Sequence, residues 1–218
     1  MRKSMPSDYL WQNGDAPLGE IYTITFVRGL GDAETLERFS PDPLDIRRFS
    51  EDEVMARVEE TQGCCDIIGV RRLAGWTVAY EYCGWEGARK ELQRELSRDG
   101  GEAVTVCRHD YGHDRFSYSV DGEIVTSFDP MFPEDRWGTG PDRLLSHIAE
   151  LGLDPDRAPG ESVANRIAAS LALAGRVSGV LVREDDLTWP MLGARITTHV
   201  PSDPAAPWRR GPRGGSGT

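Results

Sequence analysis

The sequence predicts an α+β domain with a mostly antiparallel sheet of about five to six strands and helices packed on one face. Strand-like runs are joined by short turns such as Asp121-Gly122, and short turns connect antiparallel neighbours. The runs follow the order strand, helix, helix, hairpin, helix, three strands, two helices. An alternative is a mixed sheet in which the first strand lies parallel to its neighbour.

The first predicted elements are one strand and two helices. The run Ile21–Val27 alternates β-branched and aromatic residues, which is typical of a strand. Asp32 is a candidate N-cap for a helix that ends at Phe39. Ser50, which three acids follow, indicates a capping box at the start of a second helix, and Gly63 ends that helix. The more hydrophobic face of the strand carries Tyr22, Ile24 and Phe26.

A hairpin and a third helix follow. Ile67–Arg71 and Trp76–Tyr82 are strand-like runs on either side of a Leu-Ala-Gly turn. Apolar residues at i, i+4 and i+8 predict a helix from Ala88 to about Arg98. One face of the second strand carries Trp76, Val78, Tyr80 and Tyr82.

The strongest hairpin signal lies within the stretch Ala103–Gly138. The dipeptide Asp121-Gly122 tolerates positive φ at both turn positions, so a two-residue loop fixes the register of its flanking strands. The expected pairs are Val120 with Glu123, Tyr118 with Val125 and Phe116 with Ser127. The expected core side carries Phe116, Tyr118, Val120 and Val125.

The C-terminal third is predicted to be a loop followed by two helices. Phe128–Gly138 contains two prolines and three acids and reads as a loop. A proline at the first helical position predicts a helix over Pro141–Leu151. Ser162 caps a longer helix through about Arg176. Val180–Val182 is a candidate edge segment, and Leu187–Trp189 is a candidate short helical turn.

We expect three segments along the chain. Residues 1–18 are predicted to form a loose N-terminal arm, with Tyr9, Leu10 and Trp11 available as an anchor. Residues 19–190 are predicted to form a single domain. Residues 191–218 are rich in proline, arginine and glycine, a composition that cannot bury a core, so we expect a disordered tail.

Charge and hydropathy limit the function classes. The net charge is −11 and the pI is about 4.9. Phosphate backbones need clustered Lys and Arg, so a nucleic-acid partner is not expected, whereas a basic protein would be attracted. The N-terminal stretch lacks the apolar core that a signal peptide needs, so no signal peptide is expected. No apolar run approaches the ~20 residues of a membrane span, so no membrane partner is expected. Four cysteines without a CxxC pair fit a reduced, cytoplasmic protein.

Three sequence blocks carry a resemblance to a known family. They are IYTITFVRGL, GWTVAYEYCGWEG and RFSYSVDGEIVTSFDPMFPEDRWG. Together they resemble an uncharacterised domain-of-unknown-function family of high-GC bacteria, over about Tyr9 to Leu187. The chain departs from that family in Pro41–Phe49 and in its arginine-bearing tail. The resemblance implies a cytoplasmic single-domain protein and brings no established activity and no catalytic residue.

One cluster has metal-like spacing. Cys107, His109 and His113 form C-x-H-x₃-H, and zinc accepts thiolate and imidazole ligands. Asp110 or Asp114 would have to supply the fourth ligand. The alternative is a plain surface turn between two strands. We favour the turn and expect no metal and no other cofactor.

Acid pairs are a second candidate. Asp129, Glu134 and Asp135 lie in the proline-rich segment, and Glu81 lies in a strand that is otherwise poor in charge. Two carboxylates held close together have separated pKa values and can perform acid/base work. The alternative is structural, because an Asp before a proline commonly holds a turn. We favour the structural reading and expect no catalytic residue.

The tryptophans in turns are a third candidate. Trp85 and Trp137 either plug the core from a loop or anchor a partner. We favour the plug. If a partner does bind here, the expected patch consists of Glu81, Trp85, Glu86, Asp129, Asp135, Arg136 and Trp137.

These observations favour a non-enzymatic, acidic, cytoplasmic interaction module, immunity-like or regulatory, whose partner is a basic protein. The alternative is a small hydrolase or ligand-binding enzyme that uses the Asp129–Asp135 loop. An enzyme needs a water-accessible pocket where polar groups converge. A module instead spreads its acids over an open face, with Asp129 and Arg136 held by local hydrogen bonds.

Overall fold

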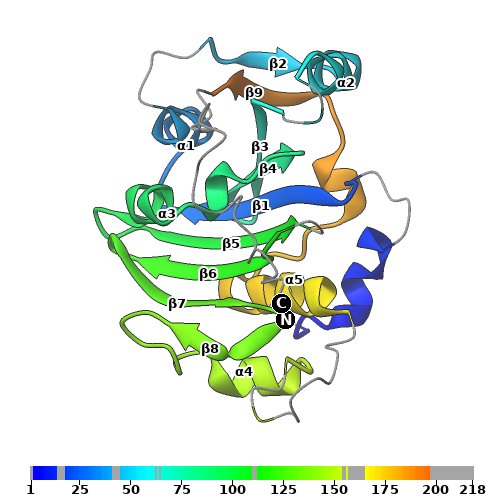
Figure 1. Cartoon of the computed structure of the whole chain (residues 1–218). Helices are drawn as coiled ribbons and strands as arrows, with labels where there is room; N and C mark the ends of the chain where they lie inside the picture. Colours follow the sequence, from blue (N-terminus) through cyan, green and yellow to red (C-terminus); the bar gives the residue numbers. More distant parts are fainter. Residues whose placement is uncertain are drawn as a thin grey trace, which may run out of the picture.

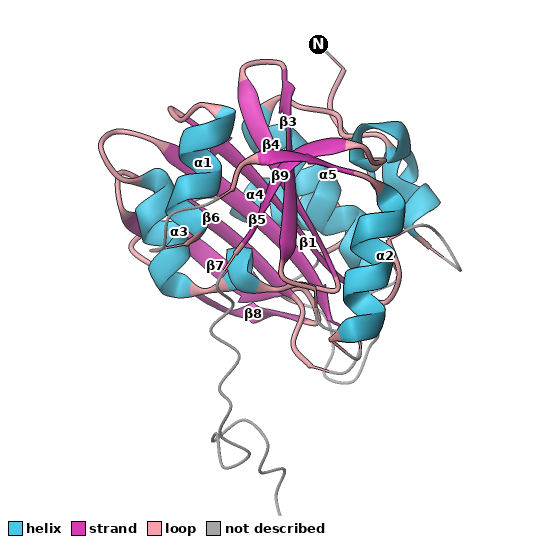
Figure 2. Ribbon diagram, turned by 90° about the horizontal axis from the view of Figure 1, so that it is seen from above, coloured by secondary structure: helices cyan, strands magenta, loops and turns pink. Residues whose placement is uncertain are grey.

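In a computed structural model, the chain forms one nine-stranded antiparallel sheet with helices on both faces (Figures 1 and 2). The structure describes residues 2–13, 18–40, 45–61, 63, 65–109, 112–153, 156 and 165–196. The strand order is β2-β9-β3-β4-β1-β5-β6-β7-β8. The strands are β1 (Ile21–Arg28), β2 (Arg47–Phe49), β3 (Ile67–Leu73), β4 (Trp76–Tyr82), β5 (Glu102–His109), β6 (Arg115–Val120), β7 (Glu123–Asp129), β8 (Phe132–Trp137) and β9 (Met191–Arg195).

The α+β class is confirmed, but the expected sheet of about five to six strands is too small. A parallel first strand is also wrong, because β1 pairs antiparallel with both β4 and β5. Three strands escaped prediction. The segment 128–138, expected to be a loop, contains the whole of β8, β2 lies before the capping box, and β9 lies within the segment expected to be a tail.

The helices do not share one face of the sheet, contrary to the prediction. The large core joins α5 to the side that carries Tyr22, Ile24 and Phe26, while α1 and α3 cover the opposite side with Leu36 and Leu96. Residues 22–27 of β1 are all buried, and a strand buried on both faces needs cover on both. The helices are η1 (Pro6–Gln12), α1 (Asp32–Phe39), α2 (Glu51–Glu60), η2 (Glu86–Ala88), α3 (Lys90–Ser97), α4 (Leu145–Glu150), α5 (Arg166–Ser178) and η3 (Glu184–Leu187).

Local signals placed several elements well. α1 ends at Phe39 as predicted, but its N-cap is Gly31, and Asp32 is its first residue. Ser50 and Glu53 form the predicted capping box at the start of α2. α4 begins four residues after the expected proline, so Pro141 is not its first residue. Ser162 lies outside the described residues, and the described helix α5 begins at Arg166. Val180–Val182 forms no strand, and the helical turn η3 precedes Trp189.

The predicted hairpin register holds only next to its turn. Val120 pairs with Glu123, but a register shift between Tyr118 and Ser119 changes every pair beyond it. Tyr118 therefore faces Thr126, and Phe116 faces Phe128, whose ring stacks on it at a centroid distance of 5.2 Å. The two-residue turn could not reveal this shift, because a bulge is set by packing farther along the strands.

The N-terminal arm is docked rather than loose. η1 packs against α5, and Tyr9 is fully buried in the large core. Burial raises the pKa of the Tyr9 hydroxyl to about 12. Among the described helices, none combines the length and the apolar character that a membrane span needs.

Candidate functional site

Glu81 is a buried carboxylate in the middle of the sheet. It lies on β4 and is 2% exposed. The turn η2 covers it, and the backbone N–H groups of Glu86 and Gly87 donate to its two oxygens at 2.7 and 2.9 Å. Burial raises the pKa of the Glu81 carboxyl to about 8, although both hydrogen bonds lower it. The Glu81 carboxyl group therefore ties the turn to the sheet.

Polar side chains surround Glu81 on the same face. Thr23 donates to the carbonyl of Gly84 at 2.9 Å, and Thr25 and Thr105 share a hydrogen bond of 2.9 Å. Gln93 of α3 donates to Thr105 and to the Gly87 carbonyl. All these groups are paired within the chain. They make a satisfied polar layer between η2 and the sheet.

Trp85 and Glu86, both in the predicted patch, hold the same turn in place. The Trp85 ring meets the His109 ring edge-on at a centroid distance of 5.5 Å. Glu86 is 5% exposed, and Arg89 donates to its carboxylate at 3.0 Å. These contacts fit packing from a turn better than an open contact surface.

Asp129 has two local partners. Its Oδ1 accepts from the backbone N–H of Met131 at 2.8 Å, and its Oδ2 lies 3.2 Å from Nδ1 of His113. Arg136 donates to Asp142 at 2.7 Å and to the carbonyl of Pro133 at 3.4 Å. Both side chains are thus engaged in local hydrogen bonds.

The remaining members of the predicted patch lie on the edge strand β8. Asp135 is exposed, and Trp137 is half-buried with Nζ of Lys90 4.3 Å from its ring centroid. Acidic and basic side chains on an edge strand protect it against pairing with another chain. Protection of the sheet edge therefore explains the charged side chains on β8.

The C-x-H-x₃-H residues do not converge. His113 lies beside Asp129, while Asp114 is buried, pairs with Arg166 at 2.6 Å and accepts from the backbone of His109. Asp110 lies outside the described residues. Cys107 is buried, and burial raises the pKa of its thiol to about 12. Within the described ranges, no group of three His, Cys, Asp or Glu side chains is placed to hold a metal ion.

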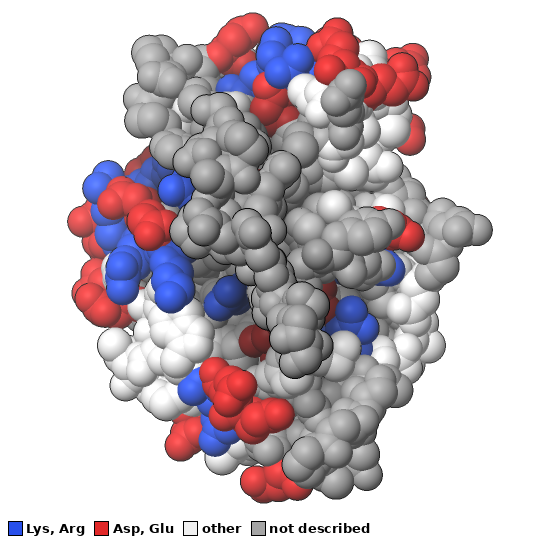
Figure 3. Space-filling view, in the orientation of Figure 1, with Lys and Arg blue, Asp and Glu red and all other residues white. Residues whose placement is uncertain are grey.

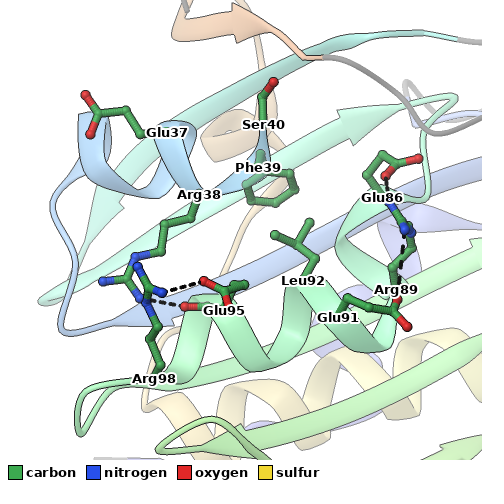
Figure 4. A pocket seen from close by; sticks show the side chains of 10 residues that line it. All are labelled: Glu37, Arg38, Phe39, Ser40, Glu86, Arg89, Glu91, Leu92, Glu95 and Arg98. Atoms are coloured by element: carbon green, nitrogen blue, oxygen red, sulfur yellow. Dashed lines mark hydrogen bonds and ion pairs between the residues drawn. The ribbon is translucent and has the colours of Figure 1, made fainter. Parts of the chain in front are cut away.

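A charged groove of about 420 Å³ lies between α1 and α3 (Figure 4). Phe39 and Leu92 form its apolar base. Its arginines engage groups of the same groove: Arg38 donates to the Glu95 carbonyl at 2.6 Å, and Arg98 pairs with the Glu95 carboxylate at 2.9 Å. The groove is thus largely neutralised from within.

A second surface, which sequence reasoning missed, lies on the opposite face of the sheet, the face that carries Tyr80. A small cavity of about 40 Å³ is walled by the rings of Tyr80, Tyr82 and Trp189. The Tyr80 and Trp189 ring centroids are 6.4 Å apart. Glu51 from the first turn of α2 and Glu184 from η3 line the same cavity. We call this the aromatic–acidic cavity.

Two exposed acids, Glu51 and Glu184, line the aromatic–acidic cavity, and Figure 3 shows acidic side chains gathered over α2. With their sequence neighbours they make four acids whose carboxylates have no hydrogen-bond or ion-pair partner within the described residues. Two arginines are engaged elsewhere, since Arg47 pairs with Glu53 and Arg71 donates to the carbonyl of Thr188, while Arg183 lies exposed next to Glu184. The four residues, which we call the acidic face, are Glu51, Asp52, Glu184 and Asp185.

The sequence shows parts of this site but does not show that they lie together. The capping-box acids and the alternation of Tyr80 and Tyr82 were visible in the sequence, but η3 follows α2 by more than a hundred positions. No local pattern reports that two such segments meet.

Comparison with known proteins places the chain in a family without assigning an activity. The model of a family described as of unknown function matches residues 2–191, which is most of the chain. No curated protein and no solved structure matches it.

Proposed function

Because the chain belongs to DUF6461, a family of unknown function, we propose its role from its own surface: a non-enzymatic module that binds a basic protein. The observation that carries the proposal is the acidic face on α2 and η3, whose carboxylates no described cation neutralises. Like charges held close together repel, and a cationic partner relieves that repulsion on binding.

Contrast with other surface acids supports this choice. Asp66 pairs with Arg57 at 2.6 Å, and Glu150 pairs with Arg176 at 2.6 Å. The four unpaired carboxylates of the acidic face differ from these paired acids, and they are gathered on two elements, α2 and η3. The net charge of −11 adds long-range attraction, which raises the association rate with a basic protein.

We do not propose catalysis at the Asp129–Asp135 segment, which was the candidate for an enzyme site. An acid/base site needs carboxylates that converge on a pocket. Asp129 is engaged with Met131 and His113, and Asp135 lies exposed on an edge strand.

We place this module in the bacterial cytoplasm as part of the same proposal. Cys65 and Cys107 are buried free thiols, which suits a reducing compartment. A basic toxin that the module neutralises, or a basic regulator that it holds, is the partner class that fits the acidic face.

Capture from an extract of the producing cells tests the proposal. The first variant changes the acidic face: Glu51→Gln, Asp52→Asn, Glu184→Gln and Asp185→Asn. The matched control makes the same change in net charge on the other side of the sheet: Glu37→Gln, Glu91→Gln, Glu95→Gln and Glu123→Gln. Mass spectrometry identifies what each immobilised chain retains.

We expect the wild type and the control variant to retain the same basic protein, and the acidic-face variant to lose it. Retention should weaken with salt, because exposed charges are screened at higher ionic strength. Equal retention of the partner by both variants would show that the acidic face does not contribute to binding. A retained partner that is acidic would contradict the proposal as well.

A further inference from the structure

We propose that the aromatic–acidic cavity is a subsite for one primary ammonium group, the side-chain end of a lysine from the partner. This inference rests on the proposed function, because two acids of the acidic face line the cavity. The walls are the rings of Tyr80, Tyr82 and Trp189. The faces of Trp and Tyr rings attract cations, and the attraction grows when the cation loses water.

The acceptors in the cavity match the donors of an ammonium group. Tyr80 is 2% exposed and lines the cavity, and within the described residues its hydroxyl has no hydrogen-bond partner. The hydroxyl is therefore available to accept a hydrogen bond from a ligand. With the carboxylates of Glu51 and Glu184 it offers three acceptor groups, and a lysine ammonium has three N–H donors.

Charge and donor geometry favour an ammonium group. The cavity measures about 40 Å³, which is room enough for a small polar head group. A lysine ammonium is a compact charge with three N–H donors on one nitrogen, which suits acceptors gathered around one cavity. Glu51 and Glu184 are exposed, so they sit at the mouth and leave the aromatic rings as walls.

Both tyrosines of the cavity have raised pKa values. Burial raises the pKa of Tyr80 well above its ordinary value, and burial together with charges that include Glu51 raises the pKa of Tyr82. Both hydroxyls thus stay protonated at neutral pH and accept through their lone pairs. A bound ammonium group does not have to displace a Lys or Arg side chain, because within the described residues none pairs with Glu51 or Glu184.

The test titrates the full chain with N-acetyl-lysine methylamide and, separately, with the uncharged N-acetyl-norleucine methylamide. The readout is the NMR shift of the Met55 methyl group, since Met55 lines the cavity. The variants are Tyr80→Phe, which keeps the ring but removes the hydroxyl, and the pair Glu51→Gln with Glu184→Gln. The control is Glu37→Gln with Glu91→Gln, which changes the net charge equally.

We expect the lysine amide to shift the Met55 signal to saturation and the norleucine amide to leave it in place. The cavity pair should weaken lysine binding by about tenfold or more, and Tyr80→Phe should weaken it less. The control pair should bind like the wild type. Equal shifts from both amides, or unchanged affinity in the cavity pair, would overturn the subsite. The comparison of the two amides on the wild type holds even if a variant fails to fold.

Failure of this inference is distinguishable from failure of the proposed function. Lysine amide that binds the cavity, beside protein capture that ignores the acidic face, would uphold the subsite and overturn the binding module. Capture that needs the acidic face, beside amides that bind alike, would overturn the subsite alone.

Discussion

The indole ring of Trp189 lies directly against the backbone of Gly69. A Cβ atom at position 69 would be 2.7 Å from the Cη2 atom of Trp189, closer than any side chain allows. Gly69 pairs with Tyr80 across β3 and β4. The missing side chain at position 69 thus lets the Trp189 ring reach its place beside Tyr80 in the wall of the aromatic–acidic cavity.

Gly69→Ala should displace the Trp189 ring and open the cavity wall. We expect the free energy of unfolding to fall by roughly 1–3 kcal/mol, as for overpacking elsewhere, and lysine amide binding to be lost. Urea denaturation and the Met55 shift measure the two effects. Gly31→Ala is the control, because its added methyl group meets nothing within 4 Å. Unchanged lysine binding in Gly69→Ala would show that Trp189 forms no part of the subsite.

The stability of the fold should depend on the ionisation of Glu81. The folded-state pKa of Glu81 is raised from 4.5 to about 8, so the unfolded chain ionises first as the pH rises. The contribution is fully present below pH 4.5 and is lost as the pH rises through 8. The loss amounts to roughly 4 kcal/mol between these limits. Denaturant unfolding at pH 5 and pH 8 measures it.

Glu81→Gln is the matching variant, because an amide does not titrate. It should lose most of the pH-dependent fall while keeping one acceptor for the turn η2. Glu95→Gln, at an exposed position of α3, should keep the wild-type slope. An identical pH slope in the wild type and in Glu81→Gln would mean that Glu81 ionises normally in the fold.

The sequence predicted elements wherever a local signal was complete. The capping box at Ser50 and the strand pattern of β1 and β4 both hold in the structure. β8 was missed because its proline and its charges indicated a loop, yet an edge strand tolerates both. β2 and β9 have three and five residues, too few for a period-2 pattern to stand out.

The predicted patch fared less well, because burial and pairing arise from tertiary structure. Glu81 was singled out correctly as an unusual acid in a strand, but its partners come from a turn that folds back over it. The acidic face joins α2 to η3, and that neighbourhood follows from the place of β9 between β2 and β3. No single segment of the sequence indicates this strand order.

Asp129 should act as a structural residue. Its two oxygens accept from Met131 and bond with His113, so Asp129→Ala should lower the free energy of unfolding by roughly 1–3 kcal/mol. Asp129→Asn retains an acceptor for the Met131 N–H and should cost less than half as much. Chemical denaturation of both variants decides this, with His113→Ala separating the imidazole contact. Equal losses from Asn and Ala would show that the turn bond is unimportant.

Both proposals depend on the binding of cations at the mouth of the aromatic–acidic cavity. Carbodiimide coupling of N-acetyl-lysine methylamide to the folded chain tests it most directly, because an activated carboxylate joins an amine that is already held beside it. Peptide mapping then gives the extent of coupling at each acid. We expect coupling at Glu51 and Glu184 well above that at Asp52 and Glu91, which are also exposed. Coupling spread evenly over all exposed acids would contradict it.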